Sequence, residues 1–163
     1  MQSKEELERW YYKEDPWQYK VNDDDISRRN RIVEILNQVN NQNLYERILD
    51  IGAGEGFVTE KLPGKILHGI EISDRASQRF PQNVQRVLEP ENKYDLVLTT
   101  GTLYPQYDHA QIKSWIDQAK SKHVLVAGIQ NWLIDYSFGN IIFDTTFPYR
   151  EFTQRVIVYE VSA

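Results

Sequence analysis

Three glycines, Gly52, Gly54 and Gly56, stand two residues apart directly after an apolar run that contains Asp50. Glycines at this spacing allow a tight turn out of a strand and let the backbone approach a ligand closely, because they carry no Cβ atom. A second acid, Glu71, ends the next apolar run, nineteen positions after Gly52. A carboxylate placed there can accept hydrogen bonds from the hydroxyl groups of a ribose. Together these residues predict a binding site for a nucleotide-containing cofactor.

The third glycine of a dinucleotide-binding turn would fall at position 57. The dinucleotide fingerprint is G-x-G-x-x-G, and its last glycine lets a helix pack closely against the strand around a pyrophosphate. Position 57 is Phe57. The sequence instead follows the pattern D-x-G-x-G-x-G from Asp50, and it resembles motif I of the class I S-adenosylmethionine-dependent methyltransferases. A dinucleotide-binding oxidoreductase and a purely structural glycine turn remain as alternatives.

The resemblance implies a set of residues that bind S-adenosylmethionine. In that family the glycine loop lies under the amino-acid end of the cofactor, and the acid after the second strand holds the ribose hydroxyls. The segment 94–100 is similar to the fourth motif, whose carboxyl end lies under the transferable methyl group. An acid that follows the third strand and accepts a hydrogen bond from the adenine has only Glu89 as its counterpart here. The residues implied for cofactor binding are Asp50, Gly52, Ala53, Gly54, Gly56, Glu71, Ile72, Thr100, Trp17 and Arg28.

The N-terminal segment 14–19 contains Asp15-Pro16-Trp17 and is followed by Arg28 and Arg29. It is similar to the D-P-W segment that precedes the core in nodulation-type N-methyltransferases and their bacterial relatives. In that group the segment folds over the cofactor, so the resemblance implies that residues 1–25 form a lid on a core of residues 26–163. The alternative is that the aromatic side chains only pack a terminal helix onto the edge of the sheet.

The acceptor end of the site is expected in the loop after the fourth strand, residues 101–109, together with the N-terminal lid. His109 is the candidate general base, since its unperturbed pKa lies near neutrality and its loop faces the expected methyl group. The structural alternative is that His109 occupies the first turn of a helix capped by Asp108 and has no chemical role. Aromatic residues gather in the segments expected to cover this end, which suits a sugar, a flat ring or an amine. They are Trp10, Tyr11, Tyr12, Trp17, Tyr19, Tyr104, Tyr107, Trp132, Tyr136 and Phe138.

The aromatic segment 131–139 either shapes the acceptor pocket or forms a dimer contact. His68 and His123 flank strands and are interpreted as structural. The spacing of the three histidines suits no metal site and the chain has no cysteine, so no metal is expected.

Composition limits the remaining classes of function. The chain has 163 residues with 40% apolar and 26% charged side chains, which predicts one soluble domain over residues 1–163. Its net charge of −5 gives no general attraction to a phosphate backbone, so a nucleic-acid partner is not expected. The polar N-terminus resembles no signal peptide and no apolar run is long enough to cross a bilayer. We expect a cytoplasmic protein without membrane contact, either a monomer or a homodimer.

Two helices are predicted before the glycine turn. Residues 3–6 have the S-x-x-E form of a capping box and open a short helix that Asp15-Pro16 ends. Apolar residues at spacings of three and four predict an amphipathic helix over residues 26–40, with Asp25 as its N-cap.

Strand and helix patterns then alternate, which predicts an α/β fold with a doubly wound, Rossmann-like, mostly parallel sheet. The expected strands are 47–51, 66–71, 84–88, 95–98 and 123–127, and the expected helices are 56–62, 74–80 and 108–120. Residues 141–143 and 155–161 are strand-like runs with no helical pattern between them, so an antiparallel C-terminal hairpin is expected at the sheet edge. Class I methyltransferases end in such a reversed last strand.

The favoured interpretation is an S-adenosylmethionine-dependent methyltransferase that transfers a methyl group to a nitrogen or oxygen atom of a small molecule, either a metabolite or a sugar. Two rivals remain. The first is a non-catalytic domain of methyltransferase type that binds S-adenosylmethionine or only a partner protein. The second is a dinucleotide-dependent oxidoreductase, which Phe57 and the reversed last strand disfavour.

Overall fold

A seven-stranded sheet in the order β3-β2-β1-β4-β5-β7-β6 forms the centre of the protein, in a computed structural model that describes residues 2–91 and 93–162. The strands are β1 (Tyr45–Ile51), β2 (Gly64–Ile70), β3 (Val84–Arg86), β4 (Leu96–Thr100), β5 (His123–Ile129), β6 (Asn140–Tyr149) and β7 (Phe152–Glu160). The first five are parallel, whereas β7 is antiparallel to both β5 and β6. The predicted α/β fold with an antiparallel C-terminal hairpin is confirmed.

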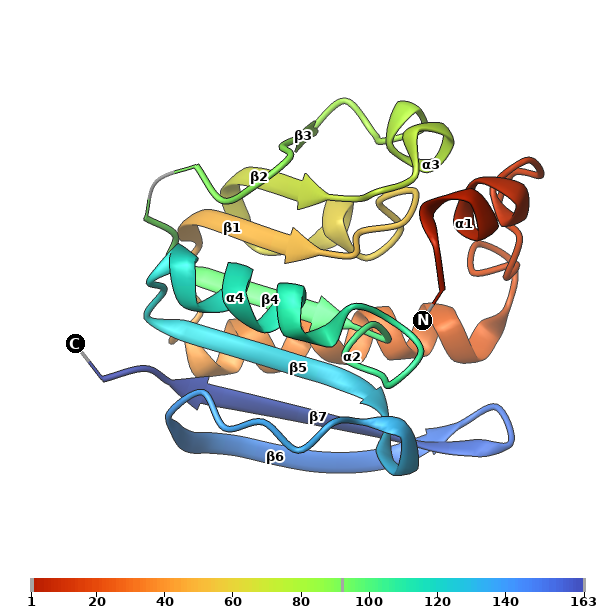
Figure 1. Cartoon of the computed structure of the whole chain (residues 1–163). Helices are drawn as coiled ribbons and strands as arrows, with labels where there is room; N and C mark the ends of the chain where they lie inside the picture. The colour runs from red at the N-terminus through yellow and green to blue at the C-terminus, as the bar shows by residue number, and fades with distance from the viewer. Residues whose placement is uncertain (1, 92, 163) are drawn as a thin grey trace.

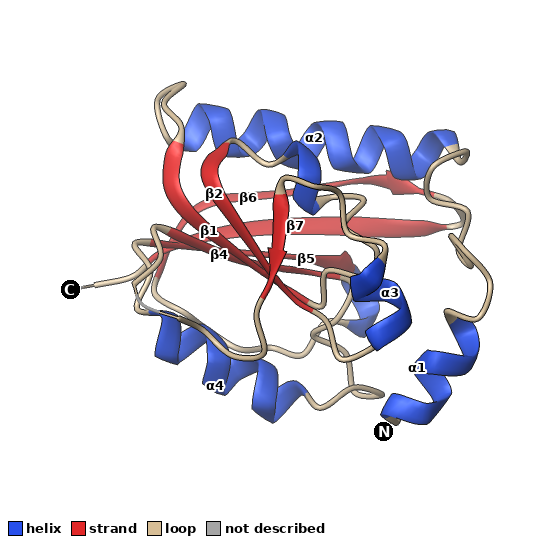
Figure 2. Cartoon of the chain, turned by 90° about the horizontal axis from the view of Figure 1, so that it is seen from above, coloured by secondary structure: helices blue, strands red, loops and turns tan. Residues whose placement is uncertain are grey.

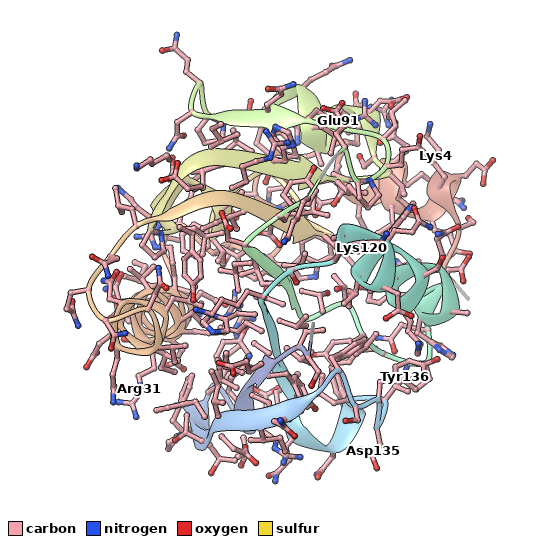
Figure 3. The ribbon with its side chains drawn as sticks, turned by 90° about the vertical axis from the view of Figure 1, so that its left-hand side faces the viewer. Lys4, Arg31, Glu91, Lys120, Asp135 and Tyr136 are labelled. Atoms are coloured by element: carbon pink, nitrogen blue, oxygen red, sulfur yellow. The ribbon has the colours of Figure 1, made fainter. Side chains whose placement is uncertain are left out.

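Helices cover both faces of this sheet (Figures 1 and 2). They are α1 (Lys4–Trp10), α2 (Asp23–Val39), α3 (Asp74–Gln78) and α4 (His109–Ala119), with two 3₁₀ turns, η1 (Thr59–Lys61) and η2 (Gln130–Trp132). α2 lies on one face and α4 on the other, while α1 and α3 lie near the carboxyl ends of the parallel strands. Figure 3 shows Arg31 of α2 and Lys120, just after α4, on these two opposite sides of the molecule.

The alternation of side chains along the strands divides the core into two layers. Ile48 of β1 packs with Ile32 and Leu36 of α2 in one apolar cluster. Its neighbour Leu49 packs with Ile116 of α4 in the other cluster. Both faces of the strands are therefore buried, as is usual for parallel sheets with helices on each side.

The glycine turn after β1 is formed as predicted, but the helix expected at residues 56–62 is not. Gly52, Gly54 and Gly56 have φ values of +77°, +61° and +86°, in the left-handed region that favours glycine. The chain then makes only the three-residue turn η1 before Pro63. The short distance between the last glycine and Pro63 leaves no room for a regular helix of several turns.

The predicted N-cap of α2 is also wrong. Asn22 is the cap, and its side chain accepts hydrogen bonds from the backbone N–H groups of Asp24 and Asp25. Asp25 instead lies in the first turn of α2 and is fully buried. Its carboxylate accepts a hydrogen bond from the Tyr149 hydroxyl at 2.6 Å and pairs with the guanidinium of Arg150. Asp25 therefore joins the start of α2 to the turn between β6 and β7.

The other boundaries differ from the sequence expectations by a few residues, except in the hairpin. β6 is much longer than the run 141–143 that predicted it and continues to Tyr149, and β7 begins three residues earlier than predicted, at Phe152. In the N-terminal helix the Ser3 side chain accepts from the Glu6 backbone N–H, as the capping box predicts. Among the described residues, no helix is long and apolar enough to cross a membrane.

We predict that Asp25→Ala lowers the free energy of unfolding by about 3 to 5 kcal/mol, because it leaves buried guanidinium charge without its counterion. Urea unfolding measures the effect. The matched control is Asp23→Ala, an exposed acid in the same helical turn, which should cost only a few tenths of a kcal/mol. Equal losses in the two variants would contradict a structural role for the Asp25 junction.

Candidate active site

One cavity of about 700 Å³ opens at the carboxyl ends of β1, β2, β4 and β5. β1 lies between β2 and β4 in the sheet, so the chain departs in opposite directions from this point. Open α/β sheets bind ligands at such a switch point. The volume falls in the range of about 300–1,000 Å³ that is usual for small-molecule and cofactor sites.

Asp50 lies near the end of β1 with 1% of its surface exposed, and it contributes to the cavity wall. Its Oδ2 accepts a hydrogen bond from the Thr59 hydroxyl at 2.7 Å, whereas its Oδ1 has no partner among the described residues. Burial raises the pKa of this carboxyl to about 7, against the lowering effects of the Thr59 hydrogen bond and of Arg28. A buried acceptor oxygen without a donor is ready to receive a donor from a ligand.

Glu71 holds the two loops that follow β1 and β2. Its Oε1 accepts from the Gly54 backbone N–H at 2.8 Å, and its Oε2 accepts from the Ser73 backbone N–H at 2.9 Å. Burial raises the pKa of Glu71 to about 7, although both hydrogen bonds act in the opposite direction. The carboxylate lies on the cavity wall next to Ile72. It therefore fixes the glycine loop and presents acceptor lone pairs to the cavity.

Arg28, from the second turn of α2, supplies positive charge to the same cavity. Its side chain is 6% exposed, and its only ion pair among the described residues is with Asp25 at 3.5 Å. The guanidinium lies over the rings of Tyr19 and Tyr149, at 5.4 and 5.5 Å from their centroids. Its Nε has no hydrogen-bond partner among the described residues. This under-used guanidinium suits a ligand carboxylate.

The N-terminal segment forms one wall of the cavity and is attached to the core beside the glycine loop. Trp17 stacks between Trp10 and Tyr19 with ring centroids 5.9 and 6.0 Å away. The Arg79 guanidinium donates to the Tyr11 carbonyl at 2.7 Å and pairs with Glu55 at 2.9 Å. These contacts place the aromatic side chains of residues 11–19 against the cavity.

Nine of the ten residues implied for cofactor binding line this one cavity. They are Asp50, Gly52, Ala53, Gly54, Glu71, Ile72, Thr100, Trp17 and Arg28. The tenth, Gly56, does not line it, because it packs against Pro81 instead. A Cβ atom at position 56 would lie only 2.7 Å from the Cδ of Pro81, so this glycine is required by close packing. Glu89 is exposed and also lies outside the cavity wall.

The structure does not bring His109 to the cavity wall. It is the first residue of α4, with Asp108 as the N-cap, and its Nδ1 shares a hydrogen bond of 2.9 Å with the Tyr136 hydroxyl. Figure 3 labels Tyr136 in the segment between β5 and β6. The position of His109 matches the structural alternative given for it and offers no support for a general base.

His68 and His123 make buried hydrogen bonds to tyrosine hydroxyls, Tyr94 and Tyr45 respectively, each at 2.8 Å. Both therefore serve the packing of the sheet. Within residues 2–91 and 93–162, no group of three or more histidine, aspartate or glutamate side chains is arranged to hold a metal ion.

Except for Trp132, sequence reasoning missed the wall that η2, the end of β5, β7 and the turn before β7 contribute. Its lining residues are Ile129, Trp132, Tyr149, Arg150, Phe152 and Gln154. Only Trp132, of the segment 131–139, reaches the cavity. The long hairpin register, which pairs Gln154 with Ile129 across β7 and β5, brings these residues to the site. No motif marks them in the sequence.

Comparison with known structures identifies the type of fold. No family model and no curated protein matches the chain. The N-methyltransferase NodS from Bradyrhizobium japonicum, in complex with S-adenosyl-L-homocysteine, aligns over 100% of both chains at 16% identity with a TM-score of 0.81. Magnesium protoporphyrin IX methyltransferase from Synechocystis, with bound S-adenosylmethionine, aligns over 98% of both chains at 13% identity with a TM-score of 0.69.

The chain has the class I methyltransferase fold. A putative RNA methyltransferase from Pyrococcus horikoshii has the same fold, and it covers 99% of this chain and 100% of its own at 13% identity and a TM-score of 0.66. The resemblance drawn from motif I is thus confirmed at the level of the fold. In this chain the glycine loop is followed by the short turn η1 and not by a regular helix.

The two raised carboxyl pKa values predict how the stability of the protein depends on pH. A carboxyl whose pKa is raised by folding stabilises the protein below its unfolded pKa, and this contribution is lost as the pH rises through the folded pKa. For Asp50 and Glu71 the loss spans the range from their usual values, near 4, to about 7. Urea unfolding should therefore show a smaller loss of stability between pH 5 and pH 8 in the double variant Asp50→Asn/Glu71→Gln than in the wild type. An identical pH dependence would contradict the burial of ionisable carboxyls.

Proposed function

We propose that this protein is a methyltransferase that uses S-adenosylmethionine and methylates a nitrogen or oxygen atom of a small molecule. The observation that supports this most strongly is the convergence of Asp50, Glu71 and Arg28 on one cavity at the switch point of the sheet. Their chemistry is complementary to that of the cofactor's amino-acid end and ribose.

The charged side chains of the cavity match the polar groups of S-adenosylmethionine one by one. The free Oδ1 of Asp50 is complementary to the ammonium of the methionine moiety, and the guanidinium of Arg28 is complementary to its carboxylate. Glu71 would accept from the ribose hydroxyls, as a carboxylate after the second strand does in nucleotide-binding folds. The chemistry supplied when this cofactor binds is an electrophilic methyl group on a sulfonium sulfur. The protein has to align an acceptor with that methyl and exclude water, which is worth about 7–11 kcal/mol in favourable cases.

The reduced turn after the glycine loop argues against a dinucleotide. Pyrophosphate binding relies on the N-terminus of a regular helix, whose free N–H groups and dipole attract the anion. Here η1 has three residues and no such helix follows the loop. S-adenosylmethionine contains no phosphate, so the loss of this helix does not impair its recognition.

A small acceptor is supported by the way the cavity is covered. Residues 2–20 contribute Tyr11, Trp17 and Tyr19 to its wall, and the opposite wall comes from the hairpin. We infer that residues 1–25 act as a lid that must be in place for an acceptor to be enclosed. No general base is required when the acceptor atom already carries a free lone pair, so the position of His109 is compatible with activity.

The cofactor assignment predicts thermal stabilisation by S-adenosylmethionine and S-adenosylhomocysteine and none by NAD. A ligand at a hundred times its dissociation constant adds about 2.7 kcal/mol to the stability of the folded state, which a melting curve resolves. Arg28→Met and Glu71→Ala should each weaken binding about tenfold or more, since each removes a charge-assisted hydrogen bond. Arg31→Met, on the exposed side of α2, is the matched control. Stabilisation by none of the three ligands would favour the partner-binding alternative.

The lid assignment predicts that Trp17→Ala lowers turnover more than it lowers cofactor affinity. Loss of the ring opens the stacked row with Trp10 and Tyr19, so water enters the space where the acceptor is held. Calorimetric affinity for S-adenosylhomocysteine and methylation of an accepted substrate are the two readouts. Tyr12→Ala, an exposed aromatic in the same segment, is the control. Equal losses in turnover and affinity would show that Trp17 acts through the cofactor alone.

A further inference from the structure

Gln154 of β7 is a buried polar side chain that the cofactor assignment does not use. The residue is 2% exposed, yet it lines the cavity. None of the side-chain hydrogen bonds among the described residues involves its amide, although a buried amide normally has partners. Its carbonyl oxygen and its NH₂ group are therefore both free to meet a ligand.

The wall around Gln154 is aromatic. Trp132 lies between Tyr104 and Phe152, with ring centroids at 5.6 and 5.0 Å. The Tyr104 hydroxyl already accepts a hydrogen bond from the Ile129 backbone N–H, and the Tyr149 hydroxyl already donates to Asp25. The Tyr149 hydroxyl is thus engaged as a donor, whereas the Tyr104 hydroxyl keeps its own hydrogen available. Such walls favour a flat ring.

The charges at this end favour a neutral ligand. The lining residues from β5, β7 and the turns beside β7 include no aspartate or glutamate. The one cation among them, Arg150, pairs with the buried carboxylate of Asp25. An ammonium group would meet no carboxylate from these elements. A ligand carboxylate would have to compete with Asp25 for the Arg150 guanidinium. A neutral ligand costs least to desolvate.

The position of Gln154 in the sheet assigns it to the acceptor and not to the cofactor. It pairs with Ile129 at the end of β5, two strands away from β1, which carries Asp50. Figure 1 shows the β6–β7 turn at the same end of the molecule as the start of α2. Glu71 and Ile72, which we assign to the cofactor, follow β2. In the strand order β2 lies on the other side of β1 from β5 and β7.

The geometry points to Gln154 as the residue that selects the methyl acceptor, and to an uncharged flat ring with a carboxamide or lactam edge as the class of acceptor. An amide of this kind pairs with both the NH₂ and the carbonyl of Gln154, while the ring lies between the aromatic walls. This inference rests on the proposed function, because it places the acceptor relative to the S-adenosylmethionine site.

Calorimetric titration of the full chain saturated with S-adenosylhomocysteine tests it, with benzamide, benzoate and benzylamine as probes of equal ring size. Benzamide should bind at least tenfold more tightly than benzoate or benzylamine, because an analogue that leaves the Gln154 amide unpaired is rejected. Gln154→Leu should weaken benzamide binding about tenfold and leave the affinity for S-adenosylhomocysteine unchanged. Gln85→Leu, on the exposed side of β3, should change neither affinity.

A second variant distinguishes the loss of a hydrogen bond from a packing defect. Gln154→Glu keeps the size of the side chain but replaces the NH₂ donor with an anionic oxygen, so it should lose benzamide and gain benzylamine relative to the wild type. Two results would overturn this inference and leave the proposed function standing. The first is an unchanged benzamide affinity in Gln154→Leu. The second is a wild-type complex that holds S-adenosylhomocysteine but does not bind benzamide. Failure of the wild type to bind S-adenosylhomocysteine would overturn the proposed function and the inference with it.

Discussion

The carboxylate of Asp25 is the contact on which the geometry of the cavity depends. It is fully buried in the first turn of α2, where it accepts from the Tyr149 hydroxyl and pairs with Arg150 and Arg28. A buried charge of this kind is tolerated only when its partners are held in place, and it holds them in return. α2, the β6–β7 turn and the guanidinium that faces the cavity are thereby fixed relative to one another. The lid joins the same network, since Arg150 also donates to the Trp17 carbonyl.

The cavity that results has two chemically different ends. The end over β1 and β2 contains the ionisable groups Asp50 and Glu71, with the Arg28 guanidinium beside them, and it suits a zwitterionic cofactor. The end over β5 and β7 contains aromatic rings and one free amide, and it suits a neutral acceptor. β4 lies between them and brings Thr100 and Gly101 to the boundary, where an in-line transfer from one ligand to the other would occur. The order of the strands thus places the two carboxyl groups at one end of the cavity and the Gln154 amide at the other.

The sequence predicted which residues gather over β1 and β2, because local rules govern their positions. Gly52 and Gly54 are required by backbone conformation, and Asp50 and Glu71 stand at strand ends, so spacing alone identifies them. The wall from β5 and β7 was missed because it depends on pairing between distant segments. No sequence pattern marks Gln154, because its place in the cavity wall depends on the register of β7 against β5. Asp25 was misassigned as a helix cap for a similar reason, since its true partners lie 124 and 125 residues away along the chain.

The central claim is that the residues converging on this cavity bind S-adenosylmethionine, and the most direct measurement is a titration with S-adenosylhomocysteine followed by two-dimensional ¹H–¹⁵N nuclear magnetic resonance. Binding should shift the backbone amide signals of Gly54 and Ser73, whose N–H groups donate to Glu71, together with the side-chain Nε–H signal of Arg28. Saturating shifts at these three positions are the predicted result. A spectrum unchanged at all three positions, or shifts confined to residues outside the cavity wall, would contradict the account.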